Sequence, residues 1–569
     1  MNGYNNHALF SYFEYVGMDA RFEGKVPGEY FNPVLPGFFP DPSVCRKGGD
    51  FFLAHSSFAY YPGVPIFHSR DLTHWEPLGH VLARPSQLNL DGLRLNAGIF
   101  APAIAYNPRN GTFYLITTCV DGIGNFIVKT KDPFARHWSD PILLPEVTGI
   151  DPSLFFDDDG AAYIAHNDEP EGAPEWAGHR AVWLHSFDTA TDTTFGEKKV
   201  ILDAGIDRGA KPVWIEGPHL YKAGGAYLLM AAEGGTSVDH SEVVLRSDSV
   251  WGPYTPYAGN PILTQRDLPE PRPACVTSTG HADLVETPDG EWFAVFLGCR
   301  PYEGNFYNTG RETFMLPVTW KDGFPVILER GKPVPARVAR VKQPRLPDVP
   351  GARAAGSGNF RWRDDFSANR LGPEWSMVRT PRGAPWFSLD NKLVLAATEQ
   401  SIYGTGNPAF LGRRQQHACF EAETEMRFTP KNRNEIAGMV CYQNEANNFV
   451  FGKTFASPED KIEGKREGQL AVTLTRAVFL NNYVRTGTRE KKLLASVPVP
   501  AGLEDAPVRF KVKGDGALYS FYLSFGNGRW LPVAENIDGR NLSTETAGGF
   551  LGTTIGPYAT CRGGVTGAA

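Results

Sequence analysis

A hairpin-like unit recurs five times in the N-terminal half of the chain, and this repeat constrains the fold more than any other feature. Each unit has branched or aromatic residues on both sides of a glycine turn. The units read DPSVCRKGGDFFLAHSS, APAIAYNPRNGTFYLITT, DPSLFFDDDGAAYIAHN, GPHLYKAGGAYLLMAAEGG and HADLVETPDGEWFAVFLG. Their turn glycines, Gly49, Gly111, Gly160, Gly225 and Gly290, are 49 to 65 residues apart. That spacing holds four strands and a loop, which is typical of one blade of a β-propeller.

A second pattern follows some of these hairpins. The segments FHSRDLTHWEPL, VKTKDPFARHWSDPILL and LRSDSVWGPYTPY each combine a strand-like run, an aspartate and a tryptophan, and we interpret them as outer strands. A single blade leaves an apolar face open that only its neighbours can cover. Five such units therefore predict a closed five-bladed β-propeller over residues 25–342. Few segments show a helical period, so the predicted class is all-β.

The rest of the chain predicts a second β domain. Residues 343–360 are rich in proline and glycine and read as a linker. Beyond them, segments such as CFEAETEMRF, IAGMVCYQ and YSFYLSF alternate apolar and polar residues. Alternation of this kind is typical of antiparallel strands in a sandwich. We therefore expect a β-sandwich of the jelly-roll or concanavalin-like type over residues 361–569.

The first residues of the five hairpins carry acids. Aligned on their turns, the units begin at Asp41, Ala101, Asp151, Glu216 and His281. Asp41 lies between two prolines, which favour an extended backbone and would hold its carboxylate stiffly at a strand entrance. A single aspartate in that setting is most often a turn cap. However, the innermost strands of a propeller all run the same way, so these first residues meet at one mouth, and three acids and a histidine are expected near the axis.

Crowded carboxylates indicate acid–base chemistry. They cannot all be ionised at low cost, so at least one should have a raised pKa and be able to donate a proton. One protonated and one ionised carboxyl on either side of a glycosidic bond is the equipment of a glycosidase. This interpretation requires no cofactor.

The motifs FPDPS, GIDPSLFFDDDG, WIEGPHLYK, AEGGT, TGHADLV and NTGRETF, in this order, resemble glycoside hydrolase family 43, the β-xylosidases and α-L-arabinofuranosidases. The resemblance implies that Asp41 is the general base, Glu216 the general acid, and Asp151 the group that tunes and orients Glu216. It also implies inversion at the anomeric carbon, for which the carboxyls of Asp41 and Glu216 should stand about 6.5 to 9.5 Å apart. The expected enzyme is an exo-glycosidase that removes terminal β-D-xylosyl or α-L-arabinofuranosyl residues from xylan-derived oligosaccharides.

Four further positions match family motifs. Arg311 resembles an arginine that reaches the sugar, with a structural salt bridge as the alternative. His281 resembles a channel histidine that holds a divalent cation such as Ca²⁺ through waters, with a hydrogen-bonded core histidine as the alternative. Phe58 and Phe100 resemble aromatic walls of the sugar pocket, or else belong to the core. Many xylosidases have tryptophan in place of Phe100, so the choice between xylose and arabinose stays open.

The N-terminus departs from the family pattern. Family members of this type usually end in a strand resembling DFDYFEY, whereas this chain stops at CRGGVTGAA and carries ALFSYFEYVGMD near its start. Our hypothesis is a circular permutation in which residues 1–22 supply a strand of the C-terminal sandwich. The alternative is an unrelated N-terminal extension.

The composition limits the cellular location and the binding partners that we expect for this protein. The net charge is −7 with no basic stripe, and no apolar run reaches about 18 residues, so neither nucleic acid nor a membrane is an expected partner. Seven scattered cysteines without metal spacing favour a reduced, cytoplasmic setting, and a permuted chain would leave export open. The oligomeric state is not fixed, and a homo-oligomer is compatible with the sequence. Two other functions are a non-catalytic carbohydrate-binding propeller and a retaining fructosidase-like enzyme, although the latter would show NDPNG and RDP motifs that this sequence lacks.

Overall fold

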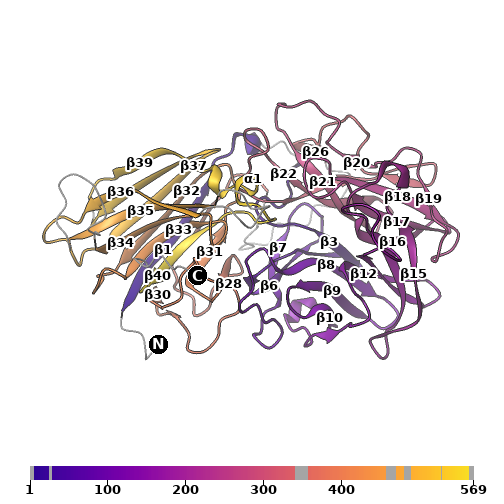
Figure 1. Cartoon of the computed structure of the whole chain (residues 1–569), viewed down its shortest axis with the longest axis horizontal. Helices are drawn as coiled ribbons and strands as arrows, with labels where there is room; N and C mark the ends of the chain where they lie inside the picture. The colour runs from indigo at the N-terminus through magenta and orange to yellow at the C-terminus, as the bar shows by residue number, and fades with distance from the viewer. Residues whose placement is uncertain are drawn as a thin grey trace.

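The computed structural model describes residues 6–24, 28–339, 357–455, 469–479, 489–526 and 528–562. Two β bodies lie against each other, a propeller and a sandwich (Figure 1). The predicted class, all-β with a five-bladed propeller and a concanavalin-like sandwich, is confirmed. Helical turns are short: η1 (Ala20–Phe22), η2 (Pro133–Ala135), η3 (Arg208–Ala210), η4 (Arg540–Leu542) and α1 (Thr544–Ala547). Among the described residues, no helix has the length and apolar character needed to cross a bilayer. The predicted linker, 343–360, lies mostly outside the described residues.

The propeller is built from the five predicted hairpins and their outer strands. Blade I contains β3 (Ser43–Lys47), β4 (Asp50–Ala54), β6 (Gly63–Ser69) and β7 (Glu76–Leu82), and blade II contains β8 (Gly98–Asn107), β9 (Thr112–Val120), β10 (Gly124–Thr130) and β11 (Ile142–Leu143). Blade III contains β12 (Ile150–Phe156), β13 (Ala162–Asp168), β14 (Ala181–Asp188) and β15 (Thr193–Asp203). Blade IV contains β16 (Glu216–Ala223), β17 (Ala226–Glu233), β18 (Ser241–Ser247), β19 (Thr255–Pro256) and β20 (Leu263–Thr264), and blade V contains β21 (Thr277–Glu286), β22 (Trp292–Cys299) and β23 (Glu312–Pro317). Two small pairs, β2 (Glu29–Phe31) with β26 (Arg337–Ala339) and β24 (Thr319–Lys321) with β25 (Phe324–Val326), accompany blade V.

The innermost strands β3, β8, β12, β16 and β21 form a closed ring, in which each contacts the next and β21 returns to β3. The ring is closed at blade V by the segment that precedes blade I. Asn32 exchanges two side-chain hydrogen bonds with the backbone of Met315 in β23 (2.9 and 3.0 Å). Leu35 and Thr313 exchange backbone hydrogen bonds (3.2 Å each). The two ends of the propeller are thereby joined, so that blade V is connected to blade I as a closed ring requires.

The sandwich has two antiparallel sheets. The first runs in the order β29 (Phe387–Leu389), β30 (Leu393–Ala396), β1 (His7–Gly17), β32 (Cys419–Arg427), β37 (Val508–Asp515), β38 (Leu518–Phe525) and β39 (Leu531–Asp538), with β27 (Arg361–Asp364) also paired to β1. The second runs in the order β36 (Arg489–Pro498), β35 (Leu470–Phe479), β34 (Asn448–Phe455), β33 (Ile436–Tyr442), β40 (Thr554–Thr560), β31 (Ala409–Arg414), β28 (Trp375–Val378) and β5 (Tyr60–Tyr61).

The N-terminal strand β1 lies in the interior of the first sheet. It is hydrogen bonded to β30 and β27 on one side and to β32 on the other. Asn6 and Cys561, near the two ends of the described chain, are hydrogen bonded to two consecutive residues. Ala397 N donates to Asn6 O (3.0 Å), and Cys561 N donates to Thr398 O (2.8 Å). This is the pairing and the proximity of ends that the permutation hypothesis requires.

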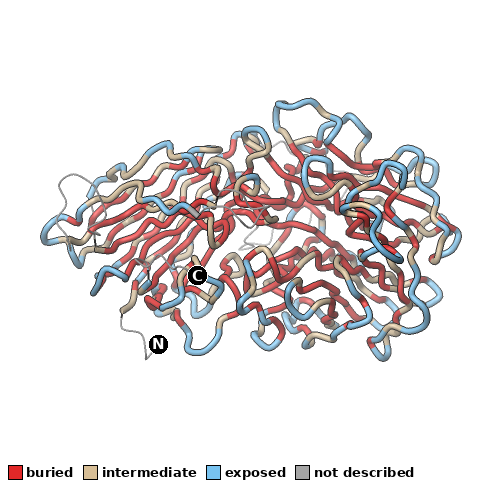
Figure 2. The backbone as a smooth tube through the Cα atoms, in the orientation of Figure 1, coloured by how far each residue is buried: buried red, intermediate tan, exposed pale blue. Residues whose placement is uncertain are grey.

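The two bodies share strands, core and buried charges. Strand β5 leaves blade I and pairs with β28 at the edge of a sandwich sheet. Buried apolar residues of blades I and II and of the sandwich belong to one continuous cluster, and buried segments lie on both sides of the junction (Figure 2). At the same junction Asp19, Arg300 and Glu312 form an ion-pair cluster, with Arg300 donating to Asp19 Oδ2 (3.0 Å) and Glu312 Oε2 (2.6 Å). The sandwich is therefore part of the same folded unit as the propeller.

Candidate active site

The innermost strands begin with the same backbone distortion. Residues Asp41, Ala101, Asp151, Gly217 and His281 all have positive φ angles, between 36° and 57°. In four blades this residue sits in a β-bulge, where the register to the next strand shifts. A bulge with a left-handed residue re-aims the side chain at that point. The expected extended backbone at Asp41 is wrong, because φ is +51°.

Tertiary hydrogen bonds hold Asp41 in this strained conformation. Ser56 Oγ donates to Asp41 Oδ2 (2.5 Å), and Arg311 Nη1 donates to Asp41 Oδ1 (3.1 Å). Ser56 also accepts from the backbone N–H of Ala101 (2.7 Å), so one hydroxyl links the inner strands of blades I and II. These contacts outweigh the local preference that proline imposes on the residue before it.

Asp151 and Glu216 share an environment that favours their protonated forms. Burial, followed by the charge of Asp41, raises the pKa of Asp151 to about 7. Burial and the nearby Asp151 raise the pKa of Glu216 well above its ordinary range. The side chain of Asp151 accepts one hydrogen bond, from Gly217 N (3.2 Å), and among the described residues none donates to the Glu216 carboxyl. Each of the three acids exposes only 5 or 6% of its surface.

His281 lies against this group of acids. Its Nδ1 is 4.0 Å from Asp41 Oδ1, and a Cβ added to Gly217 would come within 2.8 Å of its Nε2. Glycine is therefore required at 217, both for its positive φ and for this close approach. Burial lowers the pKa of His281 to about 4, so the ring is neutral at pH 7. The structure thus gathers Asp41, Asp151, Glu216 and His281 at one mouth, as the alignment of the hairpins predicts. Arg311, predicted from its family motif, joins them through its hydrogen bond to Asp41.

An aromatic cluster borders Arg311. Phe58 contacts Phe100 (4.7 Å between ring centroids), and both lie 6.1 Å from Phe550. The Arg311 guanidinium lies 4.9 Å from the Phe550 ring, and its Nε has no hydrogen-bond partner among the described residues. Phe58 is fully buried and supports Phe100, which is half-buried. The sandwich therefore contributes a side chain to the site.

Three residues of the site were not predicted from the sequence. Phe550 comes from another domain and is brought in where the backbones of Gly310 and Gly552 touch, since a Cβ on Gly310 would lie 2.7 Å from Gly552 N. Ser56 is an unremarkable serine of the HSSF stretch. Arg180 is on a loop of blade III and stacks on Trp214 (4.4 Å). Its charge offsets part of the rise in the pKa of both Asp151 and Glu216. No local pattern marks any of the three.

A propeller hub that holds two carboxyls with raised pKa values beside a third, arginine-bound one has the acid and base groups of a glycoside hydrolase. Residues 30–325 match the model of glycosyl hydrolases family 43, and residues 363–569 match that of the β-xylosidase C-terminal concanavalin A-like domain. The chain belongs to glycoside hydrolase family 43.

Known relatives extend over both domains. A xylosidase/arabinosidase of Butyrivibrio fibrisolvens is 38% identical over 538 residues, which are 94% of this chain and 96% of that protein. A non-reducing end α-L-arabinofuranosidase of Bacteroides ovatus is 35% identical, over 94% of this chain and 91% of that protein. The crystal structure of a GH43_12 protein retrieved from a capybara gut metagenome is similar with a TM-score of 0.86 and 39% identity, covering 97% of this chain and 99% of that one.

Proposed function

We propose that the protein is an inverting exo-glycosidase that releases terminal β-D-xylosyl or α-L-arabinofuranosyl residues from xylan-derived oligosaccharides. The observation that carries this proposal is the clustering of Asp41, Asp151 and Glu216 at the hub, where the pKa of Glu216 is raised and Asp41 accepts a hydrogen bond from Arg311. Named relatives with both activities support the two substrate classes.

In the proposed reaction, Asp41 accepts a proton from a water molecule whose oxygen attacks the anomeric carbon. Glu216, whose raised pKa lets it keep its proton to higher pH than an ordinary glutamate, donates that proton to the glycosidic oxygen as the C–O bond breaks. The leaving sugar departs as a neutral alcohol, and the other product has the opposite anomeric configuration. Asp151, bonded to Gly217 N next to Glu216, sets the charge around the acid.

Two aryl glycosides with different leaving groups test these roles. We expect Glu216→Ala to lose about 100-fold or more in kcat with 4-nitrophenyl β-D-xyloside or α-L-arabinofuranoside. It should lose much less with a 2,4-dinitrophenyl glycoside, because that leaving group needs no proton. Asp41→Ala should lose activity on all of them equally. Unchanged rates in both variants would contradict the assignment.

The product configuration tests inversion. NMR of the first-formed sugar from a β-xyloside should show the α anomer, and the β anomer would indicate retention. Retention would also contradict the predicted separation of about 6.5 to 9.5 Å between the carboxyls of Asp41 and Glu216. Comparing kcat/KM for the two nitrophenyl substrates ranks xylose against arabinofuranose.

The resemblance implies that His281 holds a divalent cation through waters, and the residues around it do not fit a direct calcium site. Ca²⁺ takes about six to eight oxygen ligands, whereas His281 offers a nitrogen. Among the described residues, no group of three His, Cys, Asp or Glu side chains could hold a metal. The proposed mechanism therefore routes no step through a cation, and dialysis against EDTA should leave kcat unchanged. A loss that only added Ca²⁺ restores would contradict this.

A further inference from the structure

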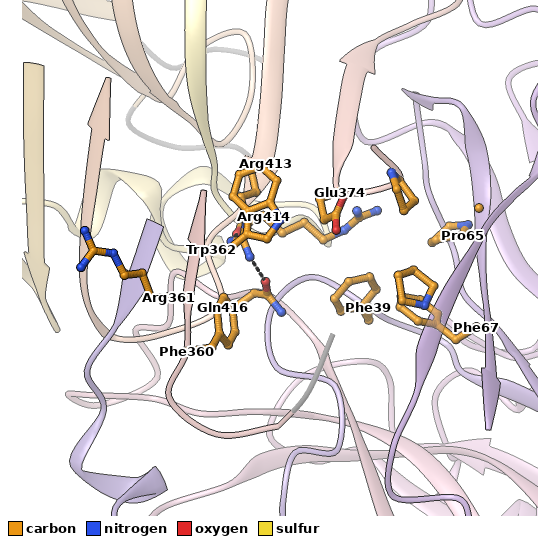
Figure 3. A pocket seen from close by; sticks show the side chains of 13 residues that line it. Phe39, Pro65, Phe67, Phe360, Arg361, Trp362, Glu374, Arg413, Arg414 and Gln416 are labelled. Carbon is orange, nitrogen blue, oxygen red and sulfur yellow. Dashed lines mark hydrogen bonds between the residues drawn. The ribbon is translucent and has the colours of Figure 1, made fainter. Parts of the chain in front are cut away.

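A cavity of about 170 Å³ lies between blade I and the sandwich, apart from the acids of the hub (Figure 3). Residues of β6 and β7 line one side, and residues of β27, β31 and the loop before β28 line the other. None of Asp41, Asp151, Glu216 and Arg311 is among the residues that line it. The cavity is large enough for several water molecules or one small ligand.

Two neighbouring arginines line this cavity and are almost fully buried. Arg413 exposes 4% of its surface and Arg414 6%. Arg413 donates to Gln416 Oε1 (2.8 Å, dashed in Figure 3) and to the carbonyl of Arg414 (3.1 Å). The guanidinium of Arg414 makes one hydrogen bond among the described residues, from Nε to the carbonyl of Phe38 (2.7 Å). Burial lowers the pKa of each to about 10, so both are charged at pH 7.

Among the described residues, Arg413 and Arg414 lack the carboxylate contact that the other buried arginines have. Other buried arginines bond to carboxylates: Arg300 to Asp19 and Glu312, Arg311 to Asp41, and Arg379 to Glu445. Within the described residues, neither Arg413 nor Arg414 is hydrogen bonded to a carboxylate. The charge of Glu374 acts on Arg413 only from a greater distance. A buried charge that stays uncompensated is costly. Water can satisfy hydrogen-bond donors in such a cavity, but it cannot neutralise the charge of the arginines.

Further polar atoms in the same wall have no partner. The described residues offer none to the Nε of Arg413, the Nε1 of Trp362 or the Oε2 of Glu374, although all three atoms are buried. The cavity thus presents several donors and one acceptor. Arg361 also lines the cavity, but it is paired with Glu14. Counting the remaining charged residues, Arg413, Arg414 and Glu374, the cavity carries a net charge of +1, which a monoanion would balance.

The residue types in the lining indicate which class of ligand the cavity can bind. Phe39, Phe67, Phe360 and Trp362 supply aromatic surface around the polar groups. Guanidinium groups bind planar carboxylates well. The free Oε2 atom of Glu374 can accept a hydrogen bond from a hydroxyl group, and aromatic walls accommodate a sugar ring.

We propose that this cavity is a second ligand site, which binds a small sugar acid through its carboxylate at Arg413 and Arg414 and through a hydroxyl at Glu374. The bound ligand touches both domains and so holds them together. This site is separate from the hydrolytic centre and does not depend on the function proposed for it.

Thermal unfolding and calorimetry with D-glucuronate test the proposal, with D-glucose as the neutral analogue and sodium sulfate as the simple anion. Glucuronate should raise the unfolding midpoint of the wild type and bind with measurable heat. Glucose and sulfate at the same concentration and ionic strength should do neither. The variants Arg414→Met and Glu374→Ala should each weaken glucuronate binding at least tenfold, a change of about 1.4 kcal/mol.

Nitrophenyl glycoside turnover serves as the folding control, because neither Arg414 nor Glu374 belongs to the hub. Both variants should keep wild-type turnover. No glucuronate binding by the wild type, equal binding of sulfate, or undiminished binding by Glu374→Ala would each overturn the proposal, even if Arg414→Met fails to fold. Competitive inhibition by glucuronate would place it in the hub instead. A wild type that binds glucuronate but hydrolyses no glycoside would contradict only the proposed function.

Discussion

Two clusters of buried charge lie in the propeller and at its junction with the sandwich, and they behave in opposite ways. At the hub, Asp151 and Glu216 have raised pKa values. At the junction, burial also raises the pKa of Asp19, but Arg300 and the N–H of Cys419 outweigh it and the pKa is lowered. Both clusters contain more carboxyls than arginines, so the count of charges alone does not separate them.

The number of hydrogen-bond donors separates them. Asp19 accepts from Arg300 and from two backbone N–H groups, and Glu312 accepts from Arg300 and from Gly37 N (2.6 Å). At the hub, Asp151 accepts a single backbone hydrogen bond, and no described residue donates to the carboxyl of Glu216. Carboxylates with many donors stay ionised and stabilise the fold, whereas carboxyls with few donors keep a proton that they can transfer.

The largest expected effect is on catalysis. Glu216→Gln should lower kcat on an alkyl xyloside by about 10² to 10⁴-fold, because Gln cannot donate a proton as an acid does. Its unfolding midpoint should stay near that of the wild type, since the carboxyl that it replaces accepts no hydrogen bond from the described residues. Activity and thermal scans on the same preparation check this. A large drop in the midpoint would break the comparison, because it would make the hub a structural cluster.

The next effect is on stability. Asp19→Ala should destabilise the protein by about 3 to 5 kcal/mol, because it leaves Arg300 and two N–H groups buried with fewer partners. Denaturant unfolding measures this. Asp267→Ala, which removes an exposed ion pair with Arg330, is the matched control and should cost about 1 kcal/mol or less. Similar losses in the two variants would show that donor number at Asp19 does not matter.

The pH dependence of stability should have two limbs. The pKa of Asp19 is lowered, so its stabilisation is present above its ordinary pKa and is lost as the pH falls through the lowered value. The pKa of Asp151 is raised to about 7, so its stabilisation is complete below its ordinary pKa of 3.8 and is lost progressively as the pH rises from there through about 7.

Midpoints measured from pH 3 to 9 check these limbs. Asp151→Asn should flatten the alkaline limb, gaining about 1 to 3 kcal/mol at pH 8 relative to the wild type, and should leave the acid limb unchanged. Asp19→Ala should flatten only the acid limb. An alkaline limb that survives in Asp151→Asn would contradict the raised pKa.

A smaller effect tests the contact between the two regions. Phe550→Ala removes the ring that covers Arg311 and should lower kcat/KM about tenfold, mainly through KM, at a cost of about 1.4 kcal/mol. Leu518→Ala, an exposed apolar residue of the same domain, is the control and should have no effect. Equal kinetics in the two variants would mean that the sandwich does not shape the site.

The smallest effect concerns chain order. A protein in which residues 1–22 are moved behind the C-terminus through a short flexible linker should keep its midpoint and its kcat, because Asn6 and Cys561 bond to adjacent residues. Asp19 would then reach Arg300 from the other end of the chain. Failure to fold would contradict the permutation hypothesis.

Much of the fold follows from local patterns. The glycine turns at Gly111 and Gly160 each lie between the first two strands of a blade, because a hairpin is specified by its own turn and alternation. The strand over residues 8–19 was found from its similarity to a family strand. The gathering of acids at the hub follows from strand direction alone. The pairing of Tyr60 and Tyr61 with the sandwich was not expected, because no pattern within blade I shows which sheet edge is free.

The site was less predictable than the fold. The conformation of Asp41 could not be derived from its prolines, because Ser56 and Arg311 impose it through tertiary hydrogen bonds. The approach of Phe550 depends on how two domains pack, and the roles of Arg180 and of the Arg413–Arg414 pair depend on which carboxylates are near.

By itself, the sequence determined the blades, the order of the domains and the residue types at the hub, since these depend on short-range periodicity and on strand direction. Only the tertiary structure decided the protonation of the acids, the aromatic cover from the sandwich and the buried arginine pair. These properties depend on distance and desolvation between groups far apart in the chain, and no local pattern encodes them.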